Sequence, residues 1–307
     1  MKNKEIKEIL CIGDLALDVL AKLDGFGLEQ LNYGSDTPSQ VSTYGGGAAA
    51  NVASWLIKMD TQPTLIARVG DDSIGNALIH ELEGSGVRCH KRVNPHLATG
   101  CVVVLVDSSG ERTMLPDSGA NAGLGLDDLP ELVNFSAAYI SGYALWNSNS
   151  HQGVLDIFKR LDQGKIPIIF DPASVGTMQK FSAGKREVIL TSIPKSKVLV
   201  LNSAEAEFLS DEKEISKSLI FLARYAEIVI IKRGDNGAIA RIGSKNQIFE
   251  VAAKSVKPLD TTGAGDSFAA GFIGQWVESG DVEAAIVEGN RLAGECVQII
   301  GARPLSE

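Results

Sequence analysis

The segment best suited to chemistry is a glycine-rich loop at residues 259–272 that runs directly into a predicted helix. Glycine lets the backbone turn tightly and lets a ligand come close to the main chain. The amides of Gly263, Ala264, Gly265 and Asp266 would then point at one spot, where a helix N-terminus adds partial positive charge. We therefore predict an anion hole that needs no lysine.

Asp266 follows this loop immediately, and its carboxylate has two interpretations. An acidic residue in the first turn stabilises the helix dipole and needs no further role. A base beside a phosphate site is also what the attack of a hydroxyl on a phosphoryl group requires. The rest of the sequence favours the second interpretation, and we predict that Asp266 is a catalytic base.

The composition limits the partners of such a site. The chain has 307 residues, 29 Lys and Arg against 38 Asp and Glu, and a net charge of −9. An acidic surface repels nucleic acids and anionic lipids. No run of about 20 apolar residues occurs that could span a membrane. We expect a cytoplasmic protein with a small-molecule substrate, no nucleic-acid partner and no membrane attachment.

Alternating short apolar strands and helices indicate an α/β fold with a mostly parallel sheet. We expect strands at 9–14, 63–70, 138–141, 166–171, 197–202 and 227–232, and a hairpin over 237–252. We expect helices at 48–59, 74–83, 151–163, 183–192, 204–209, 214–225, 264–279 and 282–299.

Two strand-rich segments, about 15–44 and 99–117, do not follow this alternation. We interpret them as one small β-sheet inserted into the α/β core, where it would serve as a lid. Two unrelated surface excursions are the alternative. Free cysteines are expected, because none of the four cysteines forms a CxxC pair.

Seven short motifs occur in an order and spacing that together resemble the ribokinase-like, or PfkB, family of carbohydrate kinases. They lie at residues 45–53, 69–75, 110–112, 119–121, 202–205, 232–237 and 260–266. A P-loop and a dinucleotide GxGxxG motif are both absent. The resemblance implies one kinase domain over residues 1–307, with a three-layer core, a central mostly parallel sheet flanked by helices, and a β-sheet lid.

The resemblance also implies catalytic roles for this chain. Asp266 would take the proton of the acceptor hydroxyl, and Gly263, Ala264 and Gly265 would hold the developing charge. Asn202 and Glu205 would organise Mg²⁺, with Glu205 acting through water. An N-cap Asn followed by an early-turn Glu is the structural alternative for that pair.

Further residues are implied for the nucleotide and for a cation. Lys232, Gly234 and Gly237 would contact ATP, and Asn290 would lie on the adenine side or simply face solvent. Asp260 resembles a residue of the loops that hold K⁺ in many members.

The acceptor site is expected at Asp14, Asp18, Gly45, Gly46 and Asn51. A carboxylate such as Asp18 accepts two hydroxyl hydrogen bonds, and the glycines allow close approach to the backbone. Asp14 as a turn residue and Asn51 as a helix-start residue are the alternatives.

These residues predict an ATP-dependent sugar kinase that phosphorylates a hydroxyl, most simply a primary alcohol. The alternatives are a nucleoside kinase of the same fold, for which Phe26 and Tyr33 are the aromatic candidates, or a non-catalytic sugar or nucleotide sensor. Arg112 is interpreted as a lid-surface arginine. Lids of this family often pair between subunits, which suggests a homodimer.

Overall fold

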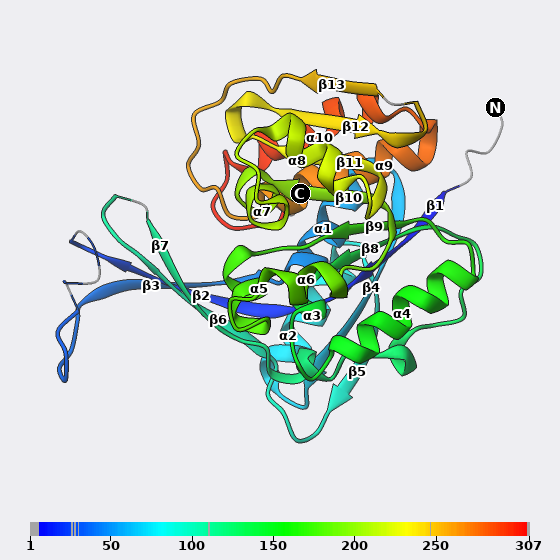
Figure 1. The fold of residues 1–307 in the computed structure, drawn as a ribbon. Helices are drawn as coiled ribbons and strands as arrows, with labels where there is room; N and C mark the ends of the chain where they lie inside the picture. The colour runs from blue at the N-terminus through cyan, green and yellow to red at the C-terminus, as the bar shows by residue number, and fades with distance from the viewer. Residues whose placement is uncertain are drawn as a thin grey trace.

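The computed structural model describes residues 6–25, 27, 29, 31–109, 111–245 and 247–305. These residues form a nine-stranded sheet and a separate four-stranded sheet (Figure 1). The large sheet has the order β13-β12-β11-β10-β9-β8-β1-β4-β5. Its strands from β11 to β5 are parallel, and β12 and β13 add an antiparallel hairpin at one edge.

The strands of the large sheet are short and mostly buried on both faces, as parallel strands between helical layers must be. They are β1 (Lys7–Ile12), β4 (Thr61–Gly70), β5 (Arg88–Asn94), β8 (Phe135–Ser141), β9 (Ile168–Asp171), β10 (Ser196–Asn202), β11 (Ala226–Lys232), β12 (Ala238–Ile242) and β13 (Gln247–Val251).

Two hydrophobic clusters of described residues, one on each face of the large sheet, make the fold a three-layer sandwich. One face is covered by α1 (Ala48–Leu56), α2 (Ser73–Gly84), α9 (Ala264–Ser279) and α10 (Val282–Cys296). The other is covered by α3 (Gly142–Leu145), α4 (His151–Gln163), α5 (Val175–Phe181), α6 (Arg186–Ser192), α7 (Ser203–Ser210) and α8 (Ile215–Leu222).

The small sheet, which we call the lid, has the order β3-β2-β6-β7 and extends to one side of the core (Figure 1). Its strands are β2 (Ala16–Leu23), β3 (Ser39–Gly46), β6 (Gly100–Val106) and β7 (Arg112–Asp117). β2 and β6 pair in parallel, and the outer pairs are antiparallel. The two segments that break the α/β alternation therefore form one sheet, as the sequence predicts.

Three elements of the core were not expected from the sequence. Strand β5 adds a mostly exposed edge to the sheet, and the short helices α3 and α5 come soon after β8 and β9. An edge strand with one open side lacks the apolar run of a buried strand, so its pattern is weak.

Candidate active site

A cleft of about 1070 Å³ lies where the lid faces the carboxyl ends of the parallel strands. In parallel α/β sheets the carboxyl ends of neighbouring strands meet at one edge, and ligands bind there. Three polar side chains at strand ends line the cleft: Asp171 on β9, Asn202 on β10 and Lys232 on β11. Val102 and Val104 line it from the lid.

Helix α9 begins at the floor of this cleft. Gly263 precedes it in a left-handed conformation, with φ 76°, and a Cβ there would lie 2.7 Å from the Cα of Ala302. Glycine is thus needed at this position for both conformation and space. Among the described residues no side chain caps α9, whereas Asn202 caps α7. The amide of Ala264 donates a long hydrogen bond, 3.4 Å, to the carbonyl of Thr261, and the following first-turn amides of Gly265 and Asp266 are available to an anion.

Asp266 lies in that first turn and reaches the cleft. Its Oδ2 accepts a 2.8 Å hydrogen bond from Nδ2 of Asn51. Burial raises the pKa of Asp266 to about 7, and the charges of Asp171 and Asp14 add to the shift, while Asn51 and Lys232 oppose it. A carboxylate with this pKa can accept a proton near neutral pH.

A second group of charges lies beside Asp266. Nζ of Lys232 is 3.0 Å from Oδ2 of Asp171, and both side chains are largely buried. Glu205 is 2% exposed, and its pKa is raised to about 8 by burial and by Asp171, with Lys232 acting in the opposite direction. This part of the cleft thus contains three carboxyl groups, those of Asp171, Glu205 and Asp266, and one ammonium group, that of Lys232.

This donor set suits a magnesium ion with its water shell. Mg²⁺ prefers hard oxygen ligands, keeps several waters, and binds through one or two carboxylates together with substrate phosphates. The surplus of buried carboxylate at Asp171 and Glu205 would be neutralised by such a cation.

Asn202 and Glu205 adopt the arrangement of a capping box. Oδ1 of Asn202 accepts from the amide of Glu205 at 2.9 Å, and Oε2 of Glu205 accepts from the amide of Asn202 at 2.8 Å. Nδ2 of Asn202 donates to the other Glu205 oxygen at 2.6 Å. The structural alternative for this pair is thus present, and both residues also line the cleft.

The predicted acceptor residues gather at the lid end of the cleft, which Asp14, Asp18 and Asn51 line. Burial and the neighbouring Asp14 raise the pKa of Asp18 to about 6. Burial also raises the pKa of Asp14, although its Oδ2 accepts from the amide of Ala48 at 3.1 Å. Its Oδ1 is buried without a hydrogen-bond partner among the described residues, and the nearby hydroxyl of Ser141 lowers the pKa of this carboxyl.

The two predicted glycines lie outside the cleft lining, and each makes room for a different side chain. A Cβ at Gly46 would overlap the carboxylate of Asp18, so this glycine makes room for a predicted substrate ligand. A Cβ at Gly45 would instead overlap the guanidinium of Arg303. Gly45 thus supports Arg303, a residue that sequence reasoning did not identify.

The prediction for Asp260 does not fit the side chains around it. Its carboxylate accepts from the guanidinium of Arg112, from the amide and hydroxyl of Thr262, and from the amide of Gly301. A guanidinium against this carboxylate leaves the side chain unsuited to K⁺. The same contact corrects the interpretation of Arg112, which links the lid to the loop before α9 instead of lying on the lid surface.

The remaining nucleotide candidates lie outside the cleft lining. Gly234 and Gly237 both have positive φ and form the turn between β11 and β12, next to a shallow hollow of about 670 Å³. Asn290 donates to the carbonyls of Val251 and Ala252 at 3.3 and 3.4 Å. Asn290 thus joins α10 to the end of β13.

Comparison with known proteins agrees with this architecture. Residues 6–307 match the model of the pfkB family of carbohydrate kinases. An ATP-dependent ribose-1-phosphate kinase from Halopiger xanaduensis is 31% identical over 287 residues, which cover 92% of this chain and 89% of the relative. The chain therefore belongs to the pfkB family of carbohydrate kinases.

Solved structures agree on the fold. Adenosine kinase from Sinorhizobium meliloti superposes with a TM-score of 0.84 at 22% identity, covering 98% of this chain and 97% of the other. A candidate ribokinase II from E. coli, in complex with ATP and Mg²⁺, gives a TM-score of 0.83 at 24% identity, covering 97% and 94%. Within the described residues, none of the helices is long and apolar enough to cross a membrane.

Proposed function

We propose that this protein transfers the γ-phosphate of ATP to a hydroxyl, most simply a primary alcohol, of a small carbohydrate. The observation that carries the proposal is the position of Asp266 beside the uncapped start of α9, at the floor of a cleft that the lid faces. The reaction is ATP + R–CH₂OH → ADP + R–CH₂OPO₃²⁻ + H⁺. The oxygen–phosphorus bond to the acceptor forms as the bond to ADP breaks.

In this mechanism Asp266 takes the acceptor proton as the hydroxyl oxygen attacks. Its raised pKa matches it to that task, because a base works best with a pKa near the operating pH. The amides of Gly263, Ala264 and Gly265 stabilise negative charge on the transferred group. Asp14 and Asp18 hold other hydroxyls of the acceptor.

The nucleotide phosphates would lie between α9 and the ends of β10 and β11. Lys232 supplies a fixed positive charge there, and Asn202 and Glu205 form the adjacent wall. Bound Mg²⁺ would neutralise phosphate charge, held by Glu205 through water and by Asp171. The turn at Gly234 and Gly237 would pass beside the nucleoside part. Asn290, with its amide turned to the β13 main chain, is a weaker candidate for adenine contact.

A carbohydrate is the better-supported acceptor class. A nucleoside acceptor would call for aromatic lid residues that stack on its base, and the sequence offers Tyr33 and Phe26. Tyr33 is fully exposed, and Phe26 lies outside the described residues. The similarity to a ribose-1-phosphate kinase adds sugar phosphates to the acceptors that need testing.

The Asp266→Asn variant tests the proposal, with ADP formation measured against a panel of sugars, sugar phosphates and nucleosides. We expect acceptor-stimulated turnover in the native protein and a loss of about 100-fold or more in the variant, since a general base contributes at least that much. Full turnover in the variant would rule out the proposed base. Nucleotide binding without acceptor-stimulated turnover by the native protein would favour a sensor.

Pairing of lids would explain the apolar side chains that this sheet exposes. Val41 on β3 and Leu115 on β7 are each more than half exposed and lie outside the cleft lining. We therefore propose a homodimer through the lid, with residues 1–307 as one kinase domain in each subunit. Light scattering of the purified protein checks this, and a monomeric mass at micromolar concentration would contradict it.

A further inference from the structure

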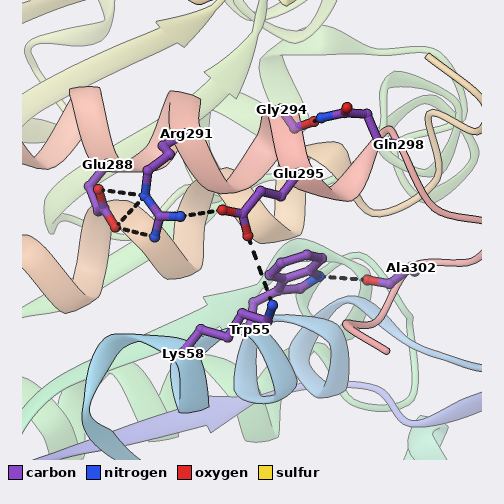
Figure 2. Close-up of polar contacts among 8 residues, drawn as sticks. All are labelled: Trp55, Lys58, Glu288, Arg291, Gly294, Glu295, Gln298 and Ala302. Atoms are coloured by element: carbon purple, nitrogen blue, oxygen red, sulfur yellow. Dashed lines mark hydrogen bonds and ion pairs between the residues drawn. The ribbon is translucent and has the colours of Figure 1, made fainter. Parts of the chain in front are cut away.

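Arg303 lies near the end of the chain, after α10, and its side chain is held inside the protein. The residue is 9% exposed. Two hydrogen bonds anchor the main chain just before Arg303. Nε1 of Trp55 donates to the carbonyl of Ala302 at 2.8 Å, and the amide of Gly301 donates to Asp260 at 3.0 Å. Figure 2 shows the Trp55 contact, which joins this segment to α1.

The guanidinium of Arg303 donates in three directions. Nε reaches Oδ1 of Asn51 at 3.3 Å, Nη1 reaches Oε1 of Glu81 at 2.8 Å, and Nη2 reaches the carbonyl of Gly46 at 2.8 Å. It therefore connects α1, α2 and the end of lid strand β3. A lysine has no planar fork and could not reproduce this set.

The contact with Asn51 determines which way the amide of Asn51 points. Arg303 has only donors, and an ionised Asp266 has only acceptors. Asn51 lies between them, so its oxygen must face Arg303 and its NH₂ group must face Asp266. Without the guanidinium, the amide would be oriented from the Asp266 side alone, and only while Asp266 is ionised.

We propose that Arg303 is a positioning residue for phosphoryl transfer, which acts on Asp266 through the amide of Asn51 and on the acceptor end through Gly46. This inference rests on the proposed function of Asp266. The charge of Arg303 also opposes the rise in the pKa of Asp18. Arg303 thus acts both on the base Asp266 and on the residues that bind the acceptor, and it does not touch the reacting atoms.

The experiment compares kcat, and kcat/KM for the acceptor as a function of pH, in Arg303→Met and in a matched control, Arg291→Met. Arg291 lies on α10, where it pairs with Glu288 and Glu295, and Lys58 also contacts Glu295 (Figure 2). The control removes an arginine with two carboxylate partners but has no link to Asn51. Melting temperatures of both variants report their structural cost.

In the native protein we expect kcat/KM for the acceptor, which reports the free enzyme, to rise with pH around a midpoint of about 7, set by Asp266 with Asp171, Asp14 and Lys232 around it. Arg303→Met should lower kcat by about 10-fold to 100-fold and move the midpoint to higher pH, because a misplaced Asn51 no longer favours the ionised base. The KM for ATP should stay within about twofold. Arg291→Met should match the native profile.

A double-mutant cycle separates positioning from general stabilisation. If Arg303 acts through Asn51, adding Arg303→Met to Asn51→Ala should lower kcat little further, since the two residues act as one unit. The inference would be overturned if the effects of the two substitutions on kcat multiplied in the double variant. It would also be overturned if Arg303→Met kept the pH midpoint of the native protein. Should Arg303→Met fail to fold, Arg303→Lys is compared with the control in its place. We expect the midpoint of its pH profile to move to higher pH as well.

The Asp266→Asn variant distinguishes this inference from the function on which it rests. An inactive Asp266→Asn protein together with a native pH profile in Arg303→Met would leave the proposed function standing and reject the positioning role. Full turnover in Asp266→Asn would reject both, because there would be no base for Arg303 to position.

Discussion

Individual residues in this site are constrained by their neighbours as much as by their own chemistry. Gly46 is an example, because it pairs with Ala16 in the lid sheet while its open side faces the carboxylate of Asp18. Any side chain here would push Asp18 out of place. The requirement is steric and does not depend on which sugar the cleft accepts.

The Gly46→Ala variant should therefore bind the acceptor poorly. We expect the KM for the acceptor to rise by about tenfold or more, because misplaced hydrogen-bonding groups lose about that much binding. The KM for ATP should change little. Gly84→Ala is the matched control, since its Cβ would meet no atom within 4 Å. Equal acceptor KM values in the two variants would contradict this account of Gly46.

Sequence reasoning located several polar residues of the cleft lining but missed Asp171, and it also missed Arg303, which lies behind the lining. Asp171 had a usable signal, because it ends a predicted parallel strand, as Asn202 does. Arg303 had none, because its partner Asn51 is 252 positions away in the chain. The lid-surface interpretation of Arg112 was wrong for the same reason, since the contact that joins it to Asp260 spans 148 positions.

Among the elements, one arginine of the lid makes two polar contacts with a loop of the core. Arg112 at the start of β7 contacts both Asp260 and Thr262 in the loop before α9. The Asp260 side chain is 7% exposed, so the pair is largely shielded from solvent. Such a shielded pair is costly to break when one partner is lost.

Arg112→Met should loosen the lid from this loop. We expect a higher KM for the acceptor, by about tenfold, and more ATP hydrolysis without acceptor relative to transfer, because a closed lid excludes water. Arg88→Met serves as the control. It removes an exposed contact between Arg88 on edge strand β5 and Glu8 on β1. Unchanged hydrolysis and acceptor KM in Arg112→Met would show that the contact does not hold the lid.

Elements with strong patterns could be predicted, and those whose form depends on tertiary contacts could not. Buried strands such as β10 and the amphipathic helix α4 were located within a residue or two of their bounds. Strand β5 was missed because its mostly exposed residues lack an apolar run. The lid was anticipated from two segments far apart, but its pairing order was not.

For the whole molecule, the concentration of raised carboxyl pKa values in one cleft ties stability to pH. The pKa values of Asp18, Asp266 and Glu205 are about 6, 7 and 8, each raised first by burial. When the pKa of a carboxyl is higher in the folded state than in the unfolded state, the folded state binds more protons at pH values between the two pKa values. Stability from these groups is therefore lost as pH rises from about 4 to 8.

We thus expect the ligand-free protein to melt at a lower temperature at pH 8 than at pH 6. The lowered pKa values of Asp72 and Asp260 do not oppose this trend, because their contribution is complete above about pH 4. In Glu205→Gln the difference should shrink. Scanning calorimetry at the two pH values measures it, and a native melting temperature that rises with pH would contradict the prediction.

The anchored segment at Gly301–Arg303 also bears on when the enzyme becomes competent during synthesis. Most of the cleft wall is built from residues before 240, yet the amide of Asn51 acquires its fixed direction only once residue 303 has been translated and docked beside Trp55. A nascent chain that stops a few residues earlier would contain the complete sheet and the lid strands but would not hold the base in place. The orientation of the Asn51 amide therefore requires residue 303 in addition to the sheet and the lid strands.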